Sequence, residues 1–331
     1  MDASLQQLLP KIREAISLDK IEPPVSVSPS LVDLIPEIRQ ALARDDVLVA
    51  EDDRALSERV AALLPKLDEK ISAAYEEARA RVTREASWAL PPLEWEVDLL
   101  SALGKGRVET AHTQCLAYLM DPKQRHGLGV SVLREFFALL GRVIPGEDAF
   151  ELLARETEDN ARRLRTMRVS AEDVMEAPSK GGHGEPLACR CDVWIELLEE
   201  GKSLFVVIEN KIDAGEHGDQ LSNYESAVWQ RARARRHLNF EARLVFLTPD
   251  GRPPDGAADK ALWLPISYRQ LAGALTRAAR EAPEPGRTLL LLYVSSILRH
   301  VLRIPARPDG VERARQLGFM NEILNAGGVV A

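Results

Sequence analysis

The chain has 331 residues, of which 45% are hydrophobic and 5% aromatic, enough for about two domains with a sizeable core. This composition excludes a disordered, fibrous or disulfide-built protein. The 43 Lys and Arg and 51 Asp and Glu residues give a formal net charge of −8, which argues against a chain that coats nucleic acid by bulk charge. Any nucleic-acid site is therefore expected to be local.

The expected compartment is the cytoplasm. Three cysteines are too few for a disulfide framework, which indicates a reducing environment. The N-terminus lacks a basic-then-apolar signal, and the longest apolar stretch, at 289–298, is shorter than the ~20 residues that span a bilayer. We expect no membrane contact.

The first 90 residues have apolar side chains at helical spacing and predict a helical N-terminal region over 1–90. A leucine–proline pattern recurs there at Pro10, Pro36 and Pro65, where proline kinks or restarts a helix. The repeat suggests stacked helical hairpins, although such strings are also common at helix starts. We expect this region to bind a partner protein or to support a homodimer.

Residues 91–310 change to a mixed α/β pattern. Two helices come first, and strands and helices then alternate around a small sheet, with a hairpin turn at 199–202. The expected strands are 191–198, 204–208 and 244–247, and the expected helices are 107–120, 130–140, 216–236, 268–281 and 288–302. Residues 311–331 are expected to form a C-terminal tail.

The most informative residues follow the apolar run Leu204–Ile208, which is typical of a strand buried on both faces. Glu209, Asn210 and Lys211 come next. Residues two apart on a strand share a face, so Glu209 and Lys211 point the same way. Burying such charges costs several kcal/mol unless they pair or meet another charge such as a metal. A surface salt bridge at the strand end is the simpler alternative.

A second carboxylate, Asp192, lies on the preceding predicted strand. It reaches the same edge of the sheet if the two strands pair through the turn at Gly201. Two carboxylates suit Mg²⁺, which prefers oxygen ligands and keeps several waters, and Mn²⁺ is expected to substitute. Lys211 is then left for acid–base work or charge neutralisation.

Asp192, followed seventeen residues later by Glu209-x-Lys211, resembles the motif of the PD-(D/E)XK nuclease superfamily. The resemblance covers roughly residues 95–305. It implies a restriction-endonuclease-like α/β core, a central mixed sheet flanked by helices, in which the Asp and Glu bind a divalent metal. Cys191 stands where the superfamily usually has proline.

Two further elements are similar to those of the superfamily. Gln220 and Tyr224 match a Gln-x-x-x-Tyr element of its exonuclease-like branch, and their spacing places both on one helical face, where we expect them to hold a phosphate and stack on a base. The helix that carries Glu109 and His112 is similar to an E-x-x-H helix of an uncharacterised prokaryotic subfamily. The superfamily often has an additional acidic ligand at the position of Glu109.

The resemblance implies metal-assisted hydrolysis of phosphodiester bonds, with DNA favoured over RNA. The expected catalytic residues are Asp192, Glu209, Lys211 and Glu109, and the expected metal ligands are Asp192, Glu209, Glu109 and the carbonyl of Asn210. Restriction or phage defence is a role common among such relatives. A catalytically inactive nuclease-like scaffold and an RNA-directed nuclease are the alternatives.

The remaining expectations concern single residues. Arg231 and Arg235 are expected to contact nucleic acid, although arginines near a helix C-terminus also complement its dipole. His112 is expected to have a structural role or to orient a carboxylate. Cys189 and Cys191 are explained by alternate strand positions, so zinc is not expected.

Overall fold

The computed structural model describes residues 53–143, 149–177, 187–199, 202–213, 215, 220–234, 240–257, 259 and 262–325. The chain divides into two compact units. The first comprises residues up to Glu85 and from Pro308 onward, and the second spans Ala86–Arg307. The sequence pattern places the corresponding changes at residues 90 and 310.

The described part of the first unit consists of two helices packed together, α4 (Asp53–Glu85) and α13 (Gly310–Asn325). The Tyr75 hydroxyl on α4 donates to Gln316 Oε1 on α13 at 2.7 Å. Arg313 Nη1 donates to Ser72 Oγ at 2.8 Å. The buried apolar side chains of the two helices include Ile71, Tyr75, Val82, Leu317, Phe319 and Met320.

Two expectations for this unit are corrected. Residues 311–331 were expected to be a tail, but helix α13 occupies most of them, because its apolar side chains are buried against α4. Pro65 lies inside a continuous 33-residue helix rather than at a restart. Good helix formers on both sides offset the loss of one backbone hydrogen bond. The pattern copies at Pro10 and Pro36 lie outside the described residues.

The second unit is built on a five-stranded mixed sheet in the order β1-β2-β3-β4-β5. Strands β1 to β3 are antiparallel to one another, whereas β3, β4 and β5 are parallel. The strands are β1 (Arg168–Ala177), β2 (Leu187–Glu199), β3 (Lys202–Asn210), β4 (Phe240–Thr248) and β5 (Trp263–Ser267). Residues 205–208 of the central strand are inaccessible to solvent, which explains their unbroken apolar pattern.

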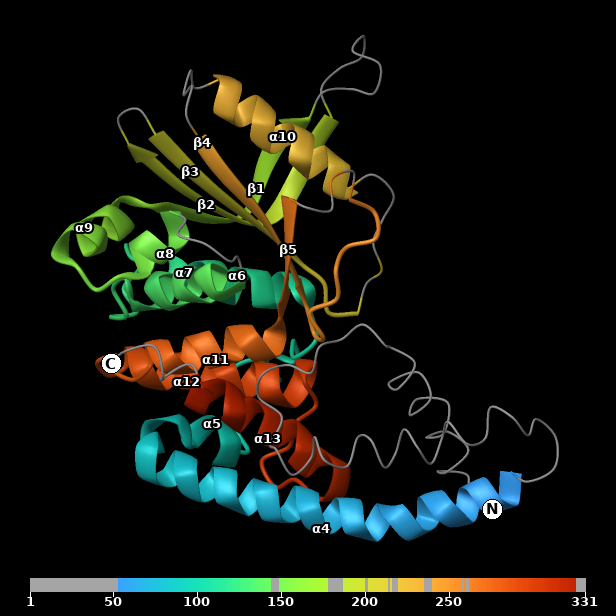
Figure 1. Cartoon of the computed structure of the whole chain (residues 1–331). Coiled ribbons are helices and arrows are strands. Elements are labelled where there is room, and N and C mark those ends of the chain that lie inside the picture. The colour runs from blue at the N-terminus through green and yellow to red at the C-terminus, as the bar shows by residue number, and fades with distance from the viewer. Residues whose placement is uncertain are drawn as a thin grey trace. The chain divides into compact units, whose positions relative to one another are not determined.

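Helices cover both faces of this sheet (Figure 1). Helix α10 (Gln220–Ala234) lies on one face, and α6 (Glu109–Met120) lies on the other, against β1 and β2. Trp194, Phe205 and Phe246 form the core beneath α10. The other helices are α5 (Pro91–Glu94), α7 (Ser131–Val143), α8 (Ala149–Ala154), α9 (Glu158–Thr166), α11 (Tyr268–Ala278) and α12 (Gly286–Ser296).

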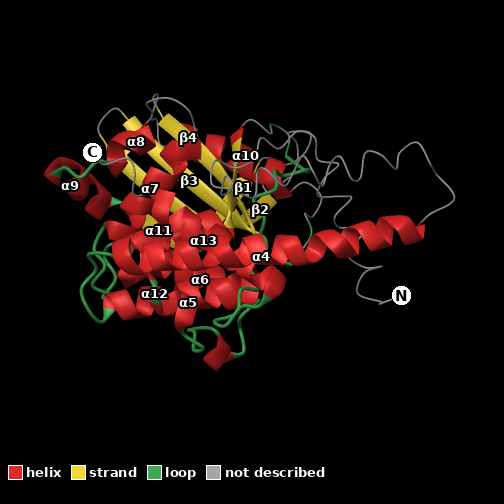
Figure 2. Cartoon of the chain, turned by 60° about the horizontal axis from the view of Figure 1, so that its bottom comes forward, coloured by secondary structure: helices red, strands yellow, loops and turns green. Residues whose placement is uncertain are grey.

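Helices α11 and α12 stand on the side of the sheet that carries α6 and α7 (Figures 1 and 2). Helix α11 packs on α7, and Arg277 Nε lies 2.9 Å from Glu135 Oε2 across this contact. A π-helical turn, Ile297–Val301, continues α12. Among the described residues, no helix combines the length and apolar character that a membrane span requires.

The expected α/β class, a central mixed sheet flanked by helices, is confirmed. The predicted strands and helices of the second unit are all present, with shifted ends. Strand β1 was not predicted. It is rich in polar and charged residues, and its central Glu172 has a left-handed backbone (φ 52°), so that the run lacks the apolar signature of a strand.

Candidate active site

The ends of β2 and β3 bring Asp192 and Glu209 together. The pairing of these antiparallel strands ends at Val193 with Ile208, and the next position sets Asp192 beside Glu209. Directly opposed residues point to the same face of a sheet, here the face covered by α10. Lys211, two residues beyond Glu209, shares this face. The predicted convergence of the three charged side chains therefore follows from the strand register.

Glu209 is completely buried, and its environment disfavours the carboxylate form. Lys211 Nζ lies 2.7 Å from its Oε1 as an ion pair. Neither carboxylate oxygen accepts a hydrogen bond of ordinary geometry from the described residues. Burial and the neighbouring charge of Asp192 raise the pKa of Glu209 to about 8, against the opposing effect of Lys211. The salt-bridge alternative is thus partly correct, but the pair is buried rather than at the surface.

Burial and neighbouring charges also shift the pKa values of Asp192 and Lys211. Burial raises the pKa of Asp192, although its Oδ2 accepts the backbone N–H of Asn210 at 2.7 Å. Burial alone would lower the pKa of Lys211, but the charges of Glu209, Asp192 and other carboxylates outweigh it and raise this pKa. The site is therefore a desolvated group of two carboxyl groups, whose pKa values are raised, and one ammonium.

Glu109 reaches the site from α6 but uses its carboxylate to hold a turn. Its Oε1 accepts the backbone N–H groups of Ile212 at 2.6 Å and Asp213 at 3.1 Å. These residues directly follow Lys211. Glu109 thus fixes the path of the chain beyond β3, and its expected role as a metal ligand stays a prediction.

Asn210 connects β3 to the layer of helices below the sheet. Its side chain points away from Glu209 and Lys211, because strand residues alternate between faces. Its Nδ2 donates to the Glu109 carbonyl at 3.1 Å and lies 3.3 Å from Thr113 Oγ1, and its Oδ1 accepts the Tyr268 hydroxyl at 2.6 Å. The side chain therefore ties the end of β3 to α6 and α11. The expected contact of its backbone carbonyl with a metal stays a prediction.

The acidic residues fit a hard divalent cation with an incomplete set of protein ligands. Asp192 and Glu209 are neighbouring desolvated carboxylates, and no hydrogen-bond donor among the described residues satisfies Oε2 of Glu209, so a bound cation would offset both unfavourable effects. Within the described residues, no three His, Cys, Asp or Glu side chains form a ready-made metal cage. Such an ion would therefore draw its remaining ligands from water, substrate or Glu109.

Gln220 and Tyr224 lie beside this site but do not present a stacking surface. Gln220 Nε2 donates to the Tyr224 hydroxyl at 2.8 Å, and that hydroxyl donates to the carbonyl of Arg190. The Tyr224 ring is 1% exposed in the core beneath α10, so the expectation that it stacks on a base is wrong in this conformation. The side chains of Arg231 and Arg235 lie outside the described residues.

His112 has a structural position rather than a contact with the acidic residues. It is fully buried, its Nε2 lies 2.9 Å from the Gly106 carbonyl, and its Nδ1 lies 3.3 Å from the Tyr293 hydroxyl. Burial lowers its pKa, which keeps the imidazole neutral at pH 7. His112 therefore supports the segment that leads to Glu109.

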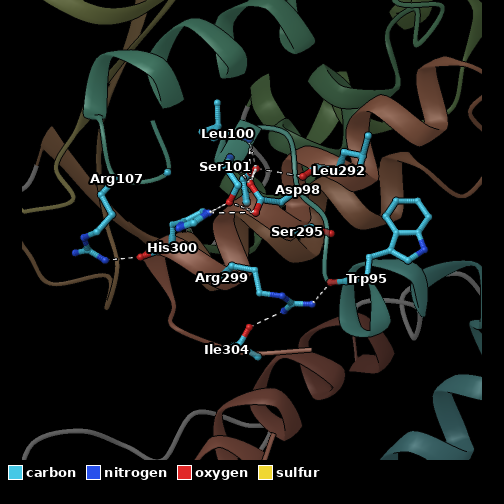
Figure 3. Close-up of polar contacts among 12 residues, drawn as sticks. Trp95, Asp98, Leu100, Ser101, Arg107, Leu292, Ser295, Arg299, His300 and Ile304 are labelled. Carbon is cyan, nitrogen blue, oxygen red and sulfur yellow. Dashed lines mark hydrogen bonds and ion pairs between the residues drawn. The ribbon is translucent and has the colours of Figure 1, made fainter. Parts of the chain in front are cut away.

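A polar cluster centred on Asp98 supports the same segment and was not predicted from the sequence (Figure 3). Asp98 accepts hydrogen bonds from Ser101 Oγ and Ser296 Oγ, and its Oδ2 lies 3.1 Å from His300 Nε2. Arg107 donates to the carbonyl of His300 and binds both carboxylate oxygens of Asp213. Arg107 thus links the cluster to the turn that follows Lys211.

Asp98, Ser101 and His300 are not arranged as a catalytic triad. Ser101 Oγ lies 2.8 Å from His300 Nε2, the same nitrogen that faces Asp98, and Ser101 Oγ also lies 2.5 Å from Asp98 Oδ2. A nucleophilic serine requires the carboxylate to hold the other ring nitrogen. Nothing in the sequence marks His300 as a partner of Asp98 and Ser101, because it lies 202 and 199 positions from them.

A family model of the PD-(D/E)XK nuclease superfamily matches residues 97–295, more than half of the chain. The chain therefore belongs to the PD-(D/E)XK nuclease superfamily, as the motif around Asp192 and Glu209 indicated. This superfamily generally comprises nucleases, which act on nucleic acid and typically use divalent metals. No curated protein and no solved structure matches the chain.

Proposed function

We propose that the protein is a Mg²⁺-dependent nuclease that hydrolyses phosphodiester bonds of DNA. The observation that carries the proposal is the buried pair of Asp192 and Glu209: no donor within the described part of the chain satisfies Oε2 of Glu209, and the ammonium of Lys211 lies beside it. Keeping two carboxylates desolvated at one strand edge is unfavourable for folding alone. A site that binds a cation accounts for that cost.

The proposed division of labour follows from these positions. Asp192 and Glu209 would hold the cation, and Glu109 would join them or keep the turn after Lys211 in place. A bound divalent cation supplies positive charge at the phosphate and makes its bound water more acidic. Lys211 adds a fixed positive charge on the same face, where it would neutralise charge that develops on the phosphate. Gln220 and Tyr224 hold β2 against α10 next to Asp192.

The decisive experiment incubates the purified full-length chain with plasmid, linear duplex and single-stranded DNA and with RNA, in Mg²⁺, Mn²⁺ or EDTA. We expect cleavage of DNA that requires the metal and is lost in Lys211→Ala, while that variant still binds DNA. Arg162→Ala, an exposed change on α9, serves as the matched control and should cleave normally. Equal degradation by wild type and Lys211→Ala would refute the assignment.

A second candidate is a nuclease-like scaffold without catalysis. It is favoured by the Glu209–Lys211 ion pair and by the engagement of Glu109 with Ile212 and Asp213, which occupy these groups within the protein. The scaffold would bind nucleic acid without a requirement for metal and would cleave none of the substrates above. Cleavage of RNA alone would instead identify an RNA-directed nuclease.

The proposed biological setting is restriction or phage defence in the cytoplasm. A cut through both strands of a duplex needs two active sites or two events, and this favours a homodimer or a partner protein bound through the N-terminal helices. Plaque counts on cells that express wild type or Lys211→Ala would test the role. If both proteins protected the cells equally against phage, the defence role would not depend on catalysis.

A further inference from the structure

Arg190 lies on the rim of the acidic site. It precedes Asp192 by two residues on β2, roughly 7 Å along the strand. Its backbone carbonyl accepts the buried Tyr224 hydroxyl, whereas its side chain is 61% exposed. The backbone is thus anchored at Arg190, two residues before Asp192, while the guanidinium remains exposed to solvent.

Among the residues that the structure describes, this guanidinium is paired with a weakly held carboxylate. Arg190 Nη2 lies 3.6 Å from Oε1 of Glu172 on β1, whose neighbours Ala171 and Asp173 pair with Val193 and Cys191. An exposed ion pair at this separation contributes at most about 1 kcal/mol. The negative charge of Glu172 also contributes to the raised pKa of Asp192. A phosphate can therefore replace Glu172 at Arg190 with little loss of stability.

Other arginines around the sheet are more firmly engaged. Arg163 binds both carboxylate oxygens of Glu199, at 2.6 and 2.8 Å. Asp213 binds Arg107 in the same way, through both of its carboxylate oxygens. Bidentate pairs of this kind are strong and geometrically fixed. Compared with these two, Arg190 has the guanidinium that a substrate can recruit most readily.

We propose that Arg190 binds a backbone phosphate of the nucleic acid, next to the phosphodiester at Asp192 and Glu209, and that Glu172 holds its guanidinium until the substrate arrives. This inference rests on the proposed nuclease function. A site with several carboxylates repels a polyanion, so a fixed cation at its rim is needed to seat the strand. Arginine suits this task because its planar fork matches phosphate oxygens.

The test measures binding in EDTA, where no cleavage competes, by fluorescence anisotropy with short labelled single-stranded DNA, duplex DNA and RNA. For the nucleic acid that wild type binds, affinity is followed over a series of salt concentrations. Loss of one phosphate contact in Arg190→Ala should weaken binding several-fold at low salt and reduce the slope of log affinity against log salt by about 0.7–0.9. Arg190→Lys should retain the slope, and Glu172→Gln should bind more tightly.

Arg162→Ala is the matched control. Arg162 is 74% exposed and faces one carboxylate, Asp159, on α9, which packs near the far end of β2. Its removal should leave the slope unchanged. An unchanged slope in Arg190→Ala, or an equal reduction in Arg162→Ala, would overturn the assignment of Arg190 while leaving the nuclease proposal intact. Failure of wild type to bind any of the three nucleic acids would overturn the proposed function itself, and this inference with it.

Discussion

Replacing Glu209 with glutamine is expected to stabilise the protein while abolishing the proposed cleavage. The carboxylate is completely buried, and its pKa rises from 4.5 to about 8 on folding. Each pKa unit corresponds to 1.36 kcal/mol, so the ionised group costs the fold up to roughly 4.8 kcal/mol. Because Glu209 shares its charge with Lys211 and Asp192, we expect about 2–4 kcal/mol in practice. Glutamine has the same shape and carries no charge.

The sign of the pH dependence distinguishes this effect from ordinary packing. Below about pH 4.5 Glu209 is protonated in both the folded and the unfolded chain, and its ionisation costs nothing. Between pH 4.5 and 8 the unfolded carboxylate ionises while the folded one resists, so wild type loses stability relative to Glu209→Gln as the pH rises. Urea unfolding of both proteins at pH 5 and pH 8 measures the difference.

Glu225→Gln is a matched control at a buried carboxylate that has hydrogen-bond donors. Glu225 Oε1 accepts the Trp263 indole N–H at 2.8 Å, so glutamine should bring no gain in stability there. A stability difference between wild type and Glu209→Gln that is the same at both pH values would refute the reasoning. So would a wild type that is the more stable protein at pH 8.

Three further changes test the contacts that support the site. In Gly106→Ala the new Cβ would lie 2.4–2.6 Å from ring atoms of His300. Urea unfolding should therefore show a loss of about 1–3 kcal/mol in the free energy of unfolding. Gly215→Ala, with open space around the new Cβ, should show little change. In Tyr268→Phe the buried Oδ1 of Asn210 loses its 2.6 Å donor, which should cost about 1–3 kcal/mol in the same assay; a neutral result would contradict the proposed tie between β3 and α11. Burial alone would raise the pKa of Asp98, but hydrogen bonds from Ser101 and other donors hold it at about 2, so Asp98→Asn should lose about 1–2 kcal/mol at pH 7. That deficit should shrink as the pH falls below about 4 towards 2, because wild type then loses the same contribution; denaturation curves at pH 7 and pH 3 would show it.

The position of the acidic pair could be predicted because it depends on local patterns. An unbroken apolar run fixes β3, and alternation along a strand fixes the common face of Glu209 and Lys211. A short hairpin turn then fixes which residue of β2 stands opposite Glu209. Each step uses residues close together in the sequence, so no knowledge of the tertiary structure is needed.

The supporting contacts could not be predicted, because they join residues far apart in the chain. Asn210 meets Tyr268 on α11, and Asp98 meets His300 beyond α12. Strand β1 could not be predicted, since its polar residues give no strand signal. The contact between Glu172 on β1 and Arg190 could therefore not be predicted either. The expectation for Tyr224 failed for a related reason. Helical spacing shows which side chains share a face, but not whether that face is turned to the core or to the substrate.

The arrangement of the site explains why the central strand is so apolar. A desolvated carboxylate pair is unfavourable by several kcal/mol, and a protein with modest net stability retains it only where neighbouring contacts compensate. Here the stabilising contacts are directly beside the carboxylate pair. Residues 205–208 are inaccessible to solvent, and hydrogen bonds of Asn210 join the end of β3 to two helices. Glu109 and Arg107 then hold the turn beyond Lys211 through Asp213. Weakening these supports should therefore disturb the acidic pair before the rest of the sheet unfolds.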